Sequence, residues 1–157
     1  MVELRHRSWS DRGRQAKGLL AEFGASWVLI DEPKFVSSIR QEFEPVGDIF
    51  YLRLHGRNWK KWWTHEQAWE RYDYLYSQEE ITDLAGDLKS MRRTHGERLR
   101  KAFVFFNNHA RGQAAVNGFM LSHEMGILIK GRPSEELLKA FPQISGMVPK
   151  PSQESLF

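Results

Sequence analysis

Polar side chains of the kinds that do chemistry stand at the ends of four short apolar runs in this chain of 157 residues. In chain order they are Glu3, Arg5, Asp31, Arg53, His55, Arg57, Asn58, Asn107, Asn108 and His109. Carboxylates and imidazoles can transfer protons, whereas guanidinium and amide groups bind anions and hydroxyl groups. The pattern therefore predicts a site for acid–base chemistry or for holding a polar ligand.

We assign these residues roles from their side-chain chemistry. Glu3 and His55 are the expected acid and base. The expected ligand-binding residues are Arg5, Asp31, Arg53, Arg57, Asn58, Tyr74, Asn107, Asn108 and His109. Arginines with neutral amide donors favour an anionic or polyhydroxyl small ligand. Nothing in the sequence specifies a cofactor.

A metal site is the alternative for the acidic and histidine residues. Glu3, Asp31, His55 and His109 have suitable ligand chemistry, but the sequence has no HExxH motif. Two arginines beside these ligands would also repel a cation. We therefore predict no metal.

Each apolar run is short and rich in β-branched and aromatic residues, which is typical of a buried strand. The predicted strands span about 2–6, 26–31, 49–55 and 101–107, with a further extended piece at 127–129. Helical spacing or capping signals predict helices at about 10–23, 35–43, 77–94, 111–124 and 134–141. This alternation predicts an α/β fold with a parallel sheet, whose strand C-termini meet at one edge.

Alternation along the strands adds a constraint on the fold. Phe50, Leu52 and Leu54 share one face of their strand, and Arg53 and His55 share the other. An open sheet covered by helices on both faces should be apolar on both, so the polar face favours a barrel interior. We expect a partial TIM-type barrel over 1–132, followed by a short helix and a loose tail over 133–157.

At the mouth of that interior we expect the strand-end residues to converge. The converging set is Glu3, Arg5, Asp31, Arg53, His55 and Asn107. The structural alternative is that Glu3 pairs with Arg5, and Asp31 with Arg53, as buried ion pairs.

The segment 57–76 is rich in tryptophan, tyrosine and basic residues. It either stacks sugars or bases, or forms a lid packed by its own side chains. Nucleic-acid binding through this loop is an alternative, although the small net charge of +3 with interleaved signs argues against a nucleic-acid partner.

Composition narrows the remaining classes of protein. The chain has no cysteine, which excludes disulfides and thiolate metal sites. No apolar run approaches the roughly 20 residues that span a membrane, and the N-terminus lacks the apolar core of a signal peptide. The expected location is the cytoplasm, without a membrane partner.

Four ordered motifs carry a resemblance to a known family. They are Glu3-Leu4-Arg5-His6-Arg7-Ser8-Trp9, Tyr51-Leu52-Arg53-Leu54-His55-Gly56-Arg57, Arg71-Tyr72-Asp73-Tyr74-Leu75-Tyr76 and Phe105-Phe106-Asn107-Asn108-His109. From about Glu3 to Met125 the chain closely resembles the YecE-like family, catalogued as domain of unknown function 72. The resemblance implies an irregular TIM barrel and no settled activity.

The family's opening Gly-Thr-Ser-Gly-Trp strand and its Glu-x-Asn-x-Thr-Phe-Tyr motif are absent from the sequence. A TIM barrel also needs about 250 residues, so we expect the C-terminal half of one. The leading hypothesis is a fragment that binds an anionic or sugar-like ligand, with hydrolysis or isomerisation if it is catalytic. The alternative is a non-catalytic assembly module completed by a missing N-terminal half. Unpaired strands at 2–6 and 103–107 also predict self-association.

Overall fold

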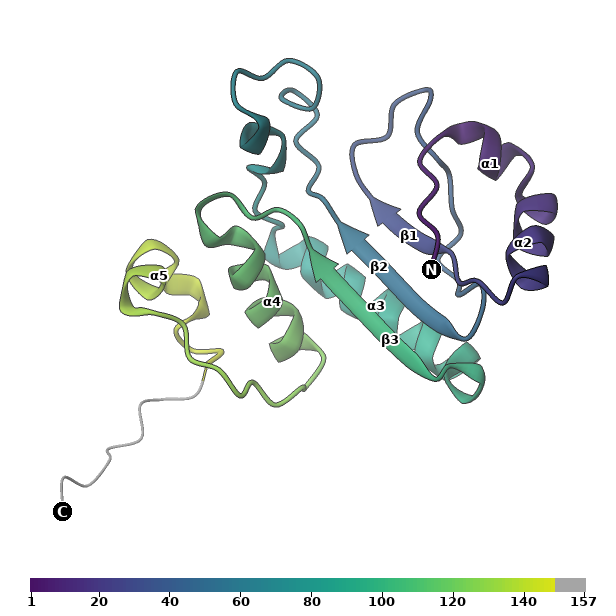
Figure 1. Ribbon diagram of the computed structural model, residues 1–157. Coiled ribbons are helices and arrows are strands. Elements are labelled where there is room, and N and C mark those ends of the chain that lie inside the picture. The colour runs from purple at the N-terminus through teal and green to yellow at the C-terminus, as the bar shows by residue number, and fades with distance from the viewer. Residues whose placement is uncertain (149–157) are drawn as a thin grey trace.

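The computed structural model describes residues 1–148 (Figure 1). Its strands are β1 (Val28–Asp31), β2 (Ile49–Leu54) and β3 (Lys101–Phe106). Its α-helices are α1 (Arg7–Asp11), α2 (Gly13–Glu22), α3 (Gln78–His95), α4 (Gln113–Glu124) and α5 (Glu135–Ala140). Short 3-10 turns lie at Ala68–Tyr72, Gly96–Arg98, Ala110–Gly112 and Pro142–Ile144.

The three strands form one parallel sheet in the order β1-β2-β3. This confirms the α/β class and the parallel pairing. Phe50, Leu52 and Leu54 are buried in a core that also contains side chains of α3 and α4, and Figure 1 shows α3 behind the sheet. We call this the helix face, and the opposite face, which carries Tyr51 and Arg53, the inner face.

Helix α3 forms where the capping signal predicts it. The Ser77 hydroxyl accepts a hydrogen bond from the Glu80 backbone N–H, and the Glu80 carboxylate accepts one from the Ser77 N–H. This capping box satisfies two donors that a helix N-terminus otherwise leaves unpaired. Ile81 and Leu88 then bury one face of the helix against the sheet.

The predicted first strand at 2–6 is wrong beyond its start. Val2 forms a single parallel bridge with Trp27, after which the chain leaves the sheet. The side chain of Gln41 occupies the edge of β1 where this strand was expected to pair. Its Nε2 donates to the Val28 carbonyl at 2.9 Å, and its Oε1 accepts from the Ile30 N–H at 3.1 Å. A side-chain amide thus replaces the strand partner, and the sheet has three strands instead of four.

The predicted helix at 35–43 and the extended piece at 127–129 are also absent from the described part of the chain. The first segment instead follows the N-terminal residues: Ile39 N–H donates to Arg5 C=O, and Arg7 N–H donates to Ser37 C=O, each at 2.8 Å. Ile127 and Leu128 lie in an irregular connection and are exposed.

Packing extends beyond residue 142, where a loose tail was expected to begin. Ile144 is fully buried in the core that contains α3 and α4. The expected loose tail falls partly on residues 149–157, which lie outside the described residues.

Candidate functional site

A cluster of charged residues lies on the inner face, where β2 ends. The Glu3 carboxylate accepts from Arg5 Nε at 2.8 Å and from Arg53 Nη1 at 2.6 Å. Arg5 Nη2 also donates to the His55 ring Nε2 at 2.8 Å. Four of the predicted site residues therefore meet, and the two predicted to act as acid and base are joined through one arginine.

His55 is the most deeply buried member of this cluster, with 1% of its surface exposed. Burial and the nearby charges of Arg5 and Arg53 lower the pKa of His55 to about 4, so the ring is neutral near pH 7. Because a guanidinium group can only donate, Nε2 accepts from Arg5, and the ring proton sits on Nδ1. Nδ1 is buried and has no hydrogen-bond partner among the described residues.

Two carboxylates in this cluster have opposite pKa shifts. Burial would raise the pKa of Glu3, but hydrogen bonds from Arg5 and Arg53 hold it below its ordinary value. Glu32 is 5% exposed, and its burial raises its pKa, while Arg5 Nη1 at 3.9 Å opposes that effect. Glu32 was not among the predicted site residues, although its position one residue after Asp31 places it on the inner face.

The expected convergence of all strand-end residues on one site is wrong for Asp31. Asp31 pairs in register with Leu54, whereas Arg53 pairs with Ile30, so Asp31 belongs to the helix face. There the Asp31 carboxylate accepts from Arg57 Nε at 3.0 and 3.1 Å. The alternative Asp31–Arg53 ion pair is therefore also wrong.

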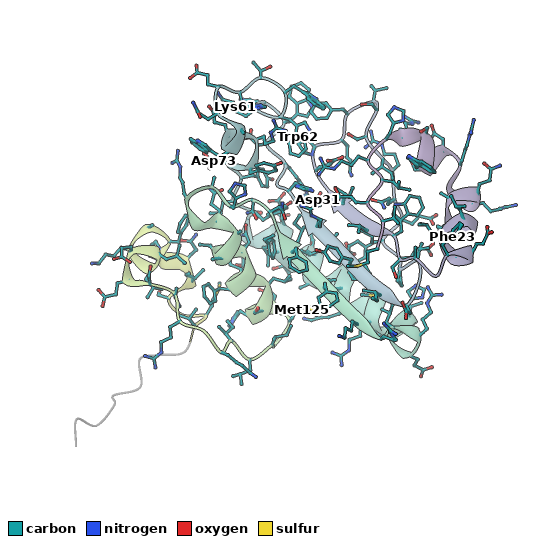
Figure 2. All side chains as sticks on the ribbon, viewed as in Figure 1. Phe23, Asp31, Lys61, Trp62, Asp73 and Met125 are labelled. Carbon is teal, nitrogen blue, oxygen red and sulfur yellow. The ribbon has the colours of Figure 1, made fainter. Side chains whose placement is uncertain are left out.

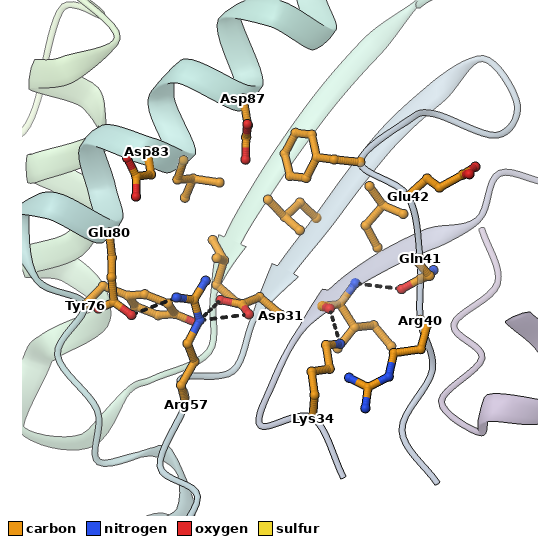
Figure 3. A pocket seen from close by; sticks show the side chains of 16 residues that line it. Asp31, Lys34, Arg40, Gln41, Glu42, Arg57, Tyr76, Glu80, Asp83 and Asp87 are labelled. Atoms are coloured by element: carbon orange, nitrogen blue, oxygen red, sulfur yellow. Dashed lines mark hydrogen bonds and ion pairs between the residues drawn. The ribbon is translucent and has the colours of Figure 1, made fainter. Parts of the chain in front are cut away.

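Arg57 links Asp31 to helix α3, because its Nη1 donates to Glu80 Oε1 at 2.8 Å. The Tyr74 hydroxyl donates to the same oxygen at 2.7 Å, and burial followed by this bond raises the pKa of Tyr74 to about 12. Figure 3 shows Asp31, Arg57 and Glu80 at one side of a cavity of about 430 Å³, with Lys34 and Arg40 at the other. Arg57 and Tyr74 therefore belong to this second cluster and are not part of the inner cluster.

The aromatic segment covers His55. Trp62 is buried, and the His55 ring lies 6.3 Å from Trp62 and 6.0 Å from Tyr72 between centroids. The His109 ring also contacts Tyr72, with 5.1 Å between the ring centroids. Asn58 closes the segment by donating to the carbonyls of Glu70 and Asp73 at 3.0 Å each. This packing supports the interpretation of residues 57–76 as a lid packed by its own side chains, and we call these residues the lid segment.

The three other tryptophans of the segment 57–76, which are Trp59, Trp63 and Trp69, remain accessible. Trp59 and Trp63 are 64% and 69% exposed, and both rings contact Phe35, at 5.8 and 5.6 Å. Figure 1 shows their two loops, 33–38 and 57–76, beyond the C-terminal ends of the strands, and Figure 2 shows Trp62 on the same side. An aromatic surface therefore lies at the same end of the sheet as the inner cluster.

Asn107 and Asn108 do not join the inner cluster through their side chains. Asn107 donates its backbone N–H to Leu54 C=O at 2.7 Å. Asn108 is fully buried, and its Nδ2 donates to Tyr74 C=O and to Asn117 Oδ1, each at 2.8 Å. Asn108 therefore fixes the end of the lid segment onto α4 and has no direct access to a ligand.

Residues 1–148 contain no group of three or more His, Asp and Glu side chains placed to hold a metal ion. In the same range no helix is long and apolar enough to cross a membrane.

Comparison with known proteins agrees with the sequence resemblance. Residues 1–140 match the family model described as a protein of unknown function, DUF72. The UPF0759 protein YunF of Bacillus subtilis is 27% identical over 146 residues, which cover 87% of this chain and 50% of YunF. The chain thus spans about half the length of that relative.

Two solved structures share the fold. A DUF72 family protein from Thermotoga maritima is 38% identical with a TM-score of 0.64, over 75% of this chain and 42% of that one. A DUF72 family protein from Enterococcus faecalis is 26% identical with a TM-score of 0.69, over 85% of this chain and 50% of that one. With the family model matching most of its length, the chain belongs to the DUF72 family.

Proposed function

We propose that the inner cluster binds an anionic or polyhydroxyl small ligand. The observation that carries this proposal is the buried Nδ1–H of His55, a donor with no partner in the described chain. Leaving such a group unpaired costs about 1–3 kcal/mol, which a ligand oxygen would recover.

The two arginines supply the charge for an anion. Arg5 and Arg53 expose 46% and 31% of their side chains, so each has N–H groups left for a ligand beyond its bond to Glu3. The ionised Glu3 offers an acceptor for a hydroxyl group. Burial raises the pKa of Glu32, the second carboxylate beside Arg5, and thereby opposes its ionised form.

The same geometry favours binding over proton transfer by His55. A ring with a pKa of about 4 is a weak base, and its Nε2 is already occupied by Arg5. Arg5 and Arg53 also hold the pKa of Glu3 below its ordinary value, so Glu3 is a weak base as well. If the site is catalytic, in hydrolysis or isomerisation, the two arginines would stabilise negative charge that develops on the substrate.

Thermal-shift measurements with inorganic phosphate, glucose and Mg²⁺ test the proposal. The parent and an Arg100→Ala control should gain stability with phosphate or the sugar, whereas Arg53→Ala should not. Arg100 is a suitable control because it forms only a surface ion pair, with Asp48 at 2.9 Å. An equal response of all three proteins, or no response of the parent, contradicts a ligand site at Arg53.

A second candidate is a non-catalytic module that another chain completes to a barrel. Two observations support it: the chain matches about half the length of YunF, and the outer edge of β3 is free within residues 1–148. Mixing this chain with the part of YunF that it does not match, followed by gel filtration, tests it. A complex of the two polypeptides supports the module, and two separate peaks contradict it.

Nucleic-acid binding through the segment 57–76 is less well supported by charge, because the positive charge of Lys61 is paired with the Glu70 carboxylate at 2.8 Å.

A further inference from the structure

One edge of the sheet is open. β3 is the terminal strand, and within residues 1–148 no strand pairs with its outer edge. Arg100 N–H donates to Asp48 C=O across to β2, so the alternation of the ladder directs the N–H groups of Lys101 and Phe103 outward. Such unpaired backbone groups are a template for another strand.

The other edge of the sheet is closed. On β1 the Val28 N–H donates to Val2 C=O at 2.9 Å, and the Gln41 side chain pairs with the next groups, on Val28 and Ile30. Residues 37–39 then bond to the N-terminal segment outside it. A second strand cannot reach this edge without displacing those contacts.

The sequence of β3 suits an apolar contact. After Lys101 the strand carries no charge as far as Phe106. On the inner face Phe105 is 45% exposed and stacks on Tyr51 at 4.9 Å, with Phe103 at 6.0 Å from the same ring. A strand that paired here would extend this aromatic cluster.

We propose that two copies of this chain pair antiparallel through β3, with Val104 on a two-fold axis perpendicular to the sheet. This register places Phe103 opposite Phe105 of the second copy, and aromatic pairs at such positions stabilise sheets. Lys101 then faces the neutral Asn107, so no like charges stand opposite each other. The axis keeps both inner faces on one side of a continuous sheet of six strands.

A single open edge also decides the symmetry. A barrel closed by two copies needs two contacts, each joining β3 of one copy to the N-terminal edge of the other. Because the edge of β1 is occupied, that arrangement is blocked. Pairing of β3 in one copy with β3 in the other is the arrangement that leaves no sheet edge open. This inference is independent of the proposed ligand site.

Cysteine cross-linking tests the register, since the chain contains no cysteine and any disulfide must join two copies. Across an antiparallel pair, facing residues lie about 4.5–5.5 Å apart between Cα atoms, within the reach of a disulfide. Val104→Cys should therefore form a covalent dimer under mild oxidation. In Ala102→Cys the two cysteines stand about 13 Å apart along the strands and should stay reduced.

Ala102 is the more exposed position, so random collisions would cross-link it at least as well as position 104. Equal cross-linking of the two variants, or none in either, overturns the proposed pairing.

Light scattering of the parent protein provides the second test. We expect a dimer at micromolar concentration, and a monomer for Phe105→Lys, which puts a charge against Phe103 of the second copy. Phe23→Lys is the matched control, because Phe23 is 75% exposed at the end of α2, far from β3, and should leave the dimer intact. A parent that stays monomeric, or a Phe105→Lys variant that stays dimeric, overturns the inference.

Discussion

Replacing His55 by glutamine should change how the stability of this protein depends on pH. The pKa of His55 falls from 6.5 in the unfolded chain to about 4 in the fold. Between these values the unfolded state binds more protons than the native state, so stability falls as the pH falls. At about 1.4 kcal/mol per pKa unit the full loss is about 3 kcal/mol, reached below pH 4.

Between about pH 7.5 and pH 5, the parent should lose about 2 kcal/mol through His55 alone. The His55→Gln variant lacks this titration, and its amide oxygen can still accept from Arg5. Urea denaturation at both pH values measures the two losses, and all other titratable groups are common to both proteins. Equal pH-dependent losses in the two proteins would refute the buried, neutral imidazole.

Three further substitutions test the packing that holds the lid segment and α3. Asn117→Ala leaves several buried hydrogen-bonding groups unpaired and should cost about 3 kcal/mol in urea denaturation; a cost below about 1 kcal/mol would contradict the network. Gly56→Ala should cost about 1–3 kcal/mol, because φ is +87° and the new Cβ would lie 2.7 Å from the Tyr74 Cβ. Gly13→Ala is the control, because its new Cβ would meet no atom within 4 Å, and equal melting temperatures of the two variants would contradict the strain at Gly56. Ser77→Ala removes an N-cap worth about 1 kcal/mol, and an equal effect of Ser90→Ala in mid-helix would contradict the cap.

Local sequence signals predicted the elements whose cause is local. The extent of α3 follows from a capping box and from apolar residues at helical spacing, both of which lie within its own sequence. The three strands that pair are likewise apolar runs with their own boundaries. The predicted first strand failed because a residue far along the chain, Gln41, supplies the hydrogen bonds that a strand partner would have supplied.

The predicted site residues fall into two clusters because their grouping also depends on residues far along the chain. Alternation places Arg53 and His55 on one side of the chain at β2, and Leu29 and Asp31 together on one face of β1, but it does not relate the two strands. The register decides that relation, and it depends on how the loop 33–48 packs. A slip of one residue would have moved Asp31 to the inner face. Site residues on different strands are therefore predictable in kind from sequence, but their grouping is not.

That division also determines which cluster suits a ligand. Asp31, Arg57 and Glu80 satisfy one another with three hydrogen bonds from Arg57, and Tyr74 completes the set. Such a closed network joins loop to helix and leaves little for a ligand to add. In the inner cluster one arginine must serve both Glu3 and His55, and a buried imidazole N–H is left over. An unsatisfied donor beside partly exposed arginines has more to gain from an incoming oxygen, which is why the proposal rests on that side of the sheet.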